Sequence, residues 1–147
     1  MVHIMKNLSW LYKVSMFIAL IGWMILIGFP TANFTDFFIT LVIVSLLCSI
    51  YAYLLFFQKT PKGELYPKGN FKDFQGIVNF FKNPKVVLIG WVHFLAFDLM
   101  VGLYIKNDAL ANDFSFWWVV PSLILTILFG PLGLLSYFLL RFLLLQF

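Results

Sequence analysis

Two ionisable residues, His93 and Asp98, lie five positions apart in the interior of an apolar run from Val86 to Ile105. The run is long enough to cross a bilayer as a helix, and an ionisable side chain at that depth costs several kcal/mol by insertion scales. Such residues usually have a function. An imidazole and a carboxyl can exchange protons with a substrate, so this pair predicts acid–base chemistry inside a membrane.

Asp98 is the candidate acid of the pair. Removal from water favours the protonated form of its carboxyl, which suits a general acid, and His93 is the natural base near neutral pH. Five residues correspond to about 140° around a helix of 3.6 residues per turn. Both side chains can reach one cavity only if this helix is central or the cavity wraps around it. Trp91 lies seven residues before Asp98, on the same face, and its indole suits a flat apolar ligand.

The residue pattern does not indicate a metal site or a cofactor. His3 is the only other histidine and Cys48 the only cysteine, so one chain cannot supply several soft ligands to a metal. Haem held by His93 alone stays open as an alternative. There is no Ser-His-Asp order and no phosphate-binding glycine loop, which disfavours triad hydrolysis and ATP-driven transport. We therefore expect no metal and no cofactor.

The composition predicts that lipid is the main solvent of this chain. Of the 147 residues, 63% are hydrophobic and only 11% are charged, too few charges to cover a soluble domain of this length. The apolar runs have the length of helices and do not alternate with a period of two, as a barrel would require. We expect an all-α membrane protein that forms one integral-membrane domain over residues 1–147.

Four apolar runs predict a bundle of four transmembrane helices. The expected spans are about 10–29, 37–57, 86–105 and 117–140. Three helices with a re-entrant segment are the main alternative. Pro121 is expected in the first turn of the last helix, near the membrane surface.

A short amphipathic helix is expected before the third span, in the lysine-rich connection 58–85. Aromatic and apolar residues recur there with helical spacing at Phe71, Phe74, Val78 and Phe81. Such a helix lies in the membrane interface with its lysines toward anionic headgroups.

The distribution of lysines predicts the orientation in the membrane. The net charge is +4, and Lys6, Lys13, six lysines of the loop 58–85 and Arg141 would share one side in a four-span topology. Only Lys106 would lie on the other. By the positive-inside rule both termini and the basic loop should be cytoplasmic, in a bacterial inner membrane. The positive charge is thus a topology signal, and we expect no nucleic-acid partner.

Pro131 predicts a polar opening in the last span, at the depth of Asp98. Proline removes one helical N–H and displaces the carbonyl of Ile127 from its hydrogen bond. Gly130 leaves room beside the backbone. We expect Asp98 and the Gly130-Pro131 kink to face one cavity, with a simple packing kink as the alternative.

The segment Trp91–Leu99 (WVHFLAFDL) resembles a small family of membrane proteins that includes neoxanthin synthase, the plant abscisic-acid-deficiency protein. The resemblance covers about residues 71–141 and includes further matched positions. These are Gly102, Asp108, Gly130, Pro131, Leu132, Gly133, Tyr137 and Arg141. It implies four transmembrane helices. For the plant member it implies isomerisation of the epoxy-carotenoid violaxanthin to allenic neoxanthin, without a redox cofactor.

That reaction needs an acid to protonate an epoxide oxygen and a base to remove a proton from the polyene. The resemblance implies Asp98 as the acid and His93 as the base or proton relay. The residues expected to bind the substrate are Trp91, Gly102, Asp108, Gly130, Pro131, Tyr137 and Arg141. The lysine-rich loop looks bacterial, so the substrate need not be violaxanthin itself.

We therefore expect an intramembrane isomerase-like enzyme that acts on a carotenoid or another isoprenoid lipid. Its expected partners are membrane lipid and this hydrophobic ligand, and a homo-oligomer is left open. A non-catalytic pigment-, haem- or lipid-binding protein is the first alternative. A small transporter or proton pathway is the second, although the other helices have no acidic residue in their interior and no inverted repeat is evident.

Overall fold

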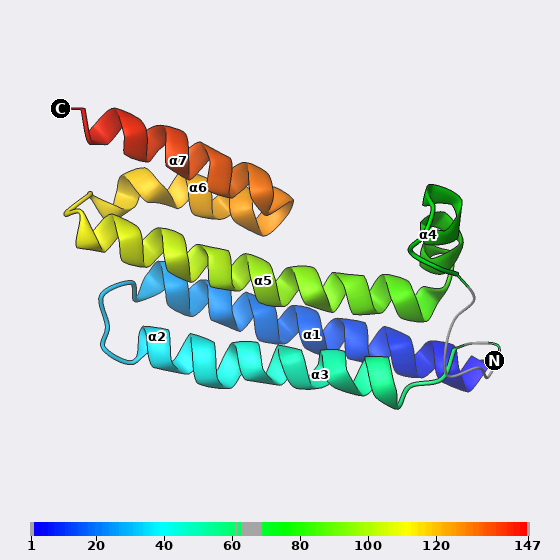
Figure 1. Ribbon diagram of the computed structural model, residues 1–147. Helices are drawn as coiled ribbons and strands as arrows, with labels where there is room; N and C mark the ends of the chain where they lie inside the picture. The colour runs from blue at the N-terminus through cyan, green and yellow to red at the C-terminus, as the bar shows by residue number, and fades with distance from the viewer. Residues whose placement is uncertain (1, 61, 63–68, 147) are drawn as a thin grey trace.

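The computed structural model describes residues 2–60, 62 and 69–146, and within them every regular element is helical (Figure 1). The elements in chain order are α1 (Val2–Gly28), α2 (Thr35–Phe37), the π-helical η1 (Phe38–Val44), α3 (Ser45–Phe56), α4 (Phe74–Phe81), α5 (Pro84–Ala111), α6 (Phe116–Phe129) and α7 (Pro131–Leu144). The all-helical fold class is thereby confirmed.

Three helices of the described chain are long and apolar enough to cross a membrane. They are Ile4–Gly28, the continuous run Thr35–Phe56 and Pro84–Ala111. They correspond to the first three spans expected from the sequence. Apolar helices of this length indicate a membrane protein, because only such helices satisfy their backbone hydrogen bonds in lipid.

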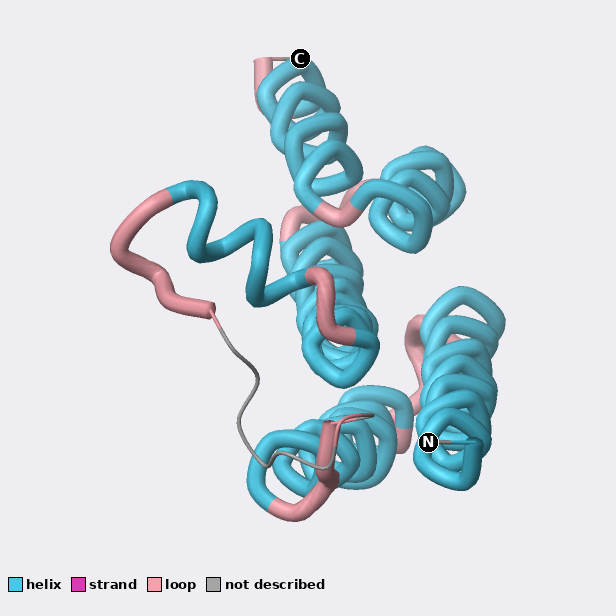
Figure 2. Tube along the Cα trace, turned by 90° about the vertical axis from the view of Figure 1, so that its right-hand side faces the viewer, coloured by secondary structure: helices cyan, strands magenta, loops and turns pink. Residues whose placement is uncertain are grey.

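Helix α5 is the central element of the molecule. The end-on view in Figure 2 shows α1 and α3 on one side of it and the α6–α7 pair on the other. It is therefore buried on several faces, and Val92, Leu99 and Leu103 belong to the core. Close helix contacts depend on glycine: a Cβ at Gly22 would meet Leu99 at 2.6 Å, and one at Gly102 would meet the ring of Trp23 at 2.6 Å.

The last apolar run differs from the expected single helix over 117–140. Helix α6 ends at Phe129, the chain reverses at Gly130, and α7 runs back antiparallel to α6 (Figure 1). Each helix has 14 residues, or about 21 Å, which is shorter than a hydrocarbon core of about 30 Å. The two helices form a hairpin whose tip lies beside the middle of α5.

The physical cause of the reversal is the conformation of Gly130. Its φ of +26° and ψ of −86° are rarely adopted by L-residues, and Pro131 then starts α7 without an N–H that could continue α6. Sequence analysis interpreted the same two residues as a kink, because proline produces a kink whenever the helix continues past it. Pro121 also differs from expectation, since it lies inside α6 and not in its first turn.

The hairpin changes the expected topology at the C-terminal end. Helix α1 begins at one end of the molecule and α7 finishes at the other, so the two ends of the chain do not lie on the same side (Figure 1). Arg141 accordingly lies at the far end of α5, beside Asp108, and not with the lysines of the long connection. The expectation that Arg141 shares a side with the lysines of the connection is wrong, because residues 117–140 do not form one continuous helix. The cytoplasmic location of the termini stays a prediction.

Helix α4 lies crosswise to the long helices at the start of α5 (Figure 1). Asp73 caps it, because its Oδ1 accepts a hydrogen bond from the N–H of Gly76 over 2.6 Å. A helix over this stretch was expected. The rest of the basic connection lies partly outside the described residues, including Glu64 and Lys68.

Candidate functional site

A cavity of about 410 Å³ lies between α5 and the tip of the α6–α7 hairpin. Its wall is apolar and aromatic, with Trp91 and Phe94 from α5 and Phe129 from α6. Asp98 is the single ionisable residue among the described residues that line it. A smaller space of about 70 Å³ on the α1 side shares Trp91, Asp98 and Ile127 with it. A carboxyl thus lies in apolar surroundings at mid-helix, where α1, α5 and the hairpin meet.

Asp98 is half-buried and lies against the backbone of the hairpin tip. A Cβ atom at Gly130 would overlap Asp98 Oδ1, so glycine is required there both for its positive φ and for space. Pro131 and Ile127 line the same cavity. The expectation that Asp98 and the Gly130-Pro131 segment face one cavity is confirmed, as is the placement of Trp91 on the Asp98 side of α5.

The hairpin tip brings two helix ends to the Asp98 side chain. The last carbonyls of a helix and its first N–H groups have no partners within the helix. Here the end of α6 and the start of α7 are separated by Gly130 alone. The start of a helix also carries a partial positive charge, which stabilises a nearby carboxylate or a developing oxyanion. The hairpin tip thus places the start of α7 beside the Asp98 carboxyl.

His93 lies in different surroundings. It lines a separate cavity of about 310 Å³ between α3 and α5, together with Tyr51 and Cys48. Its ring is exposed and stacks on Phe97, with ring centroids 4.4 Å apart and planes inclined by 27°. None of the cavities described is lined by both His93 and Asp98, so the expected common cavity is not seen in the described part of the chain. The reason is their angular separation on α5, because α3 and the hairpin lie on different sides of this helix (Figure 2).

Asp108, Tyr137 and Arg141 form a cluster of their own at the base of the hairpin. Tyr137 Oη donates to Asp108 Oδ2 over 2.5 Å, and Arg141 Nε donates to the same oxygen over 2.7 Å. Asp108 lies ten residues beyond Asp98, or about 15 Å along α5. The cluster therefore joins α7 to α5 and does not line the Asp98 cavity. Gly102 likewise packs against Trp23, so its place in the structure is one of helix packing.

Sequence analysis missed the polar residues that hold the two helices of the hairpin together. Ser136 Oγ donates to Ser122 Oγ over 3.0 Å, and Thr126 Oγ1 donates to the carbonyl of Ser122 over 2.8 Å. Gly133 packs against the backbone of Thr126. One sequence pattern could have indicated these contacts: hydroxyl residues occur on both sides of a Gly-Pro pair in an otherwise apolar run. The ion pair of Lys106 with Asp36, which joins α5 to α2, was also missed.

The fold and the site define a small helical membrane protein with one carboxyl in an apolar cavity at a hairpin tip. Residues 10–137 match the model of the ABA4-like family, described as ABA DEFICIENT 4-like, and the chain belongs to this family. This match confirms the resemblance seen in the sequence. No curated protein and no solved structure matches the chain.

Proposed function

We propose that the protein is an intramembrane isomerase-like enzyme that acts on a carotenoid or another isoprenoid lipid, with Asp98 as its acid. The observation that carries the proposal is the single carboxyl in an apolar, aromatic cavity beside the hairpin tip. Such a cavity suits a long apolar molecule with one polar group, because the walls bury the chain and Asp98 meets the polar atom. Among the described residues that line it, Asp98 is the one side chain with a usual metal-ligating group, and we propose no metal or cofactor.

In the proposed membrane arrangement α1, α3 and α5 cross the bilayer, and the α6–α7 hairpin enters from the far end of α5 and returns to it. Asp98 lies about 21 Å from the start of α5, close to the midplane. Helix α4 lies in the interface on the side of the basic connection, with Phe74 and Phe81 toward lipid. An isoprenoid substrate would reach the cavity laterally, from the lipid.

The reaction that the family resemblance implies can proceed with Asp98 alone. Protonated Asp98 donates its proton to the epoxide oxygen, the C–O bond breaks, and a positive charge forms on the adjacent carbon of the polyene. The Asp98 carboxylate then removes a proton from the next carbon, and the C–H electron pair forms the second double bond of the allene. The acid is regenerated, so atoms and electrons balance without a cofactor.

The cavity supports both charged species of this path. The π faces of Trp91 and Phe94 stabilise a positive charge on the polyene. The start of α7 stabilises the Asp98 carboxylate after it has lost its proton. His93 is not needed as the base in this scheme, which agrees with its place in a separate cavity.

Non-catalytic binding of a pigment or lipid is the second candidate function. It is favoured by one observation, the lack of a second ionisable side chain among the described residues that line the Asp98 cavity. A binding protein needs only shape and one polar contact, whereas a two-residue acid–base mechanism needs both groups in reach of the substrate.

The test uses purified protein in liposomes supplied with an epoxy-carotenoid. Retained lipid is identified by organic extraction, absorption spectroscopy and mass spectrometry, and products by chromatography. An allenic product formed by the natural protein and by Asp113→Asn, but not by Asp98→Asn, supports the enzyme. Asp113 is an exposed loop carboxyl and serves as the matched control. A retained pigment with no turnover in any variant supports binding instead. Full activity in Asp98→Asn would remove Asp98 from the mechanism.

A further inference from the structure

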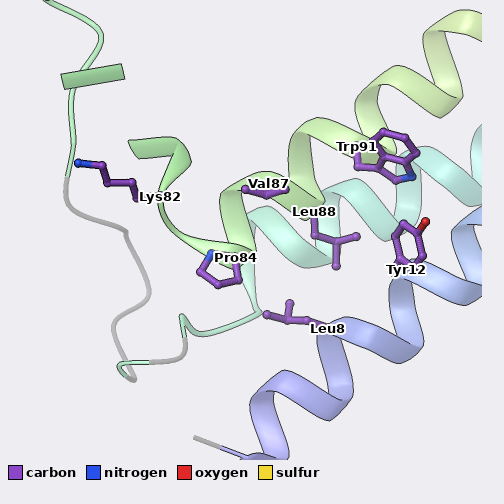
Figure 3. A pocket seen from close by; sticks show the side chains of 7 residues that line it. All are labelled: Leu8, Tyr12, Lys82, Pro84, Val87, Leu88 and Trp91. Atoms are coloured by element: carbon purple, nitrogen blue, oxygen red, sulfur yellow. The ribbon is translucent and has the colours of Figure 1, made fainter. Parts of the chain in front are cut away.

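A second apolar groove lies at the other end of α5, away from the hairpin. It has a volume of about 490 Å³ and runs between the N-terminal parts of α1 and of α5. Leu8 and Tyr12 form one wall, and Val87 and Leu88 form the other (Figure 3). Trp91 closes the inner end, where its ring lies 6.2 Å from the ring of Tyr12 between centroids. Lys82 lies at the outer rim (Figure 3).

The end of the molecule that carries this groove is strongly basic. Its described lysines are Lys6, Lys13, Lys59, Lys62, Lys72, Lys82 and Lys85. The described acidic residue of this end is Asp73, whose carboxylate is already engaged as the cap of α4. The positive potential around the groove mouth is therefore not balanced by neighbouring carboxylates among the described residues.

Two of these lysines, Lys82 and Lys85, lie close to the groove, and their ammonium groups have different surroundings. Lys85 is 1% exposed, and its ammonium donates to the carbonyl of Leu55 over 3.4 Å, inside the protein. Lys82 is exposed and donates to Asn79 Oδ1 over 3.0 Å. An ammonium has three N–H donors, so Lys82 keeps donors for an outside partner. Lys82 is the described lysine that lines the groove. Figure 3 shows its ammonium pointing away from Leu8 and Pro84, and rotation of this exposed side chain would bring the ammonium to a ligand at the groove mouth.

We propose that this groove binds one anionic phospholipid, with its phosphate at Lys82 and one acyl chain between α1 and α5. Pro84 starts α5 at the boundary between basic and apolar residues, and Trp91 lies about 10 Å deeper along the helix. An acyl chain that follows this wall stays in apolar contact while its headgroup remains at the charged surface. Basic sites between helices at a membrane surface bind anionic headgroups in this way. The proposal does not depend on the activity proposed for Asp98.

The test is native mass spectrometry of the full chain in detergent, after delipidation and addition of phosphatidylglycerol or phosphatidylcholine at equal concentration. We expect one phosphatidylglycerol to be retained in preference to phosphatidylcholine. Lys82→Gln should lower this preference severalfold, because it removes the charge that meets the phosphate. Val87→Phe should lower retention of both lipids, because it fills the groove.

Two matched variants control for general effects of charge and size. Lys72→Gln removes an exposed lysine of the same region, and Met100→Phe enlarges an exposed residue of α5. Neither residue lines the described grooves, so both variants should retain lipid like the natural protein. Equal retention of both lipids, or an unchanged preference in Lys82→Gln, would overturn the proposal. Binding of inorganic phosphate that displaces no lipid would also overturn the proposal. A dimer of the natural protein that the Val87→Phe substitution dissociates would overturn it as well.

Discussion

Asp98 and Gly130 constrain each other at the level of single residues. The carboxylate occupies the space that a Cβ at position 130 would need, and the backbone at 130 has a conformation that L-residues rarely adopt. The hairpin tip can therefore approach α5 closely only because residue 130 is glycine. The same approach brings the ends of α6 and α7 to the carboxyl that we propose as the acid.

Gly130→Ala should destabilise the protein by about 1–3 kcal/mol, because it combines backbone strain with overlap against Asp98. Thermal unfolding in detergent measures the change. Gly28→Ala is the matched control, since Gly28 has no neighbour within 4 Å of an added Cβ and an ordinary φ. Equal unfolding temperatures for the two variants would show that the tip tolerates a side chain.

Asp98→Asn should lower the proposed isomerase rate by about 10²-fold or more, the usual contribution of a general acid. His93→Ala should leave the rate within about tenfold of the natural protein, because His93 lines another cavity. Product formation in liposomes measures both. A loss in His93→Ala as large as that in Asp98→Asn would restore the two-residue mechanism and contradict the single-carboxyl scheme.

At the scale of elements, the α6–α7 hairpin is held to α5 at two places. The tip packs beside Asp98, and the base is tied through Asp108 to Tyr137 and Arg141. Between them, hydroxyl groups of Ser122 and Ser136 link the two short helices. Short helices gain little stability from their own hydrogen bonds in isolation, so the hairpin depends on these contacts and on packing against α5.

Tyr137→Phe should lower the free energy of unfolding by about 1–2 kcal/mol, because it removes a hydrogen bond to a carboxylate from a fully buried side chain. Tyr53→Phe is the control, since Tyr53 is 43% exposed and stacks on Phe57, away from the Asp108 cluster. Chemical or thermal unfolding in detergent provides the measurement. No difference between the two variants would mean that the Asp108 cluster does not anchor α7.

At the scale of the whole molecule, the hairpin makes the topology asymmetric. The lysine-rich end contains the start of α1 and the basic connection, whereas the far end contains Asp36, Asp108 and the end of α7. The position of Arg141 at the far end leaves the difference in positive charge between the two ends intact, because the lysines of α1 and of the connection lie together at the other end. By the positive-inside rule we predict that the connection lies in the cytoplasm and the end of α7 on the opposite side of the membrane.

Single cysteines in a Cys48→Ala background test this topology in intact bacterial cells. Lys72→Cys should be protected from a membrane-impermeant maleimide until the cells are lysed. Asn33→Cys and Gln146→Cys should react without lysis, because both lie at the far end. Protection of Gln146→Cys together with Lys72→Cys would instead support four crossings and contradict the re-entrant hairpin.

Much of the fold followed from local sequence patterns. The lengths of the apolar runs predicted four spans, of which the first three correspond to long apolar helices. The spacing of Trp91 and Asp98 predicted their shared face on α5. The depth of the Gly130-Pro131 pair predicted its position beside Asp98. The predicted path of the chain through this pair, a kinked but continuous helix, was wrong. These features depend on hydropathy, on helix geometry and on distance along one chain segment, all of which the sequence contains directly.

The sequence by itself determined that this is a helical membrane protein, and it determined the depth of each ionisable residue along its helix. Only the tertiary structure decided which neighbour covers each side of α5, and therefore that Asp98 faces the hairpin while His93 faces α3. It also decided that Pro131 starts a reversed helix and that Asp108 anchors Arg141. The physical reason is that these outcomes depend on contacts between distant segments. A backbone angle at Gly130 and an ion pair across 33 residues leave no local periodicity in the sequence.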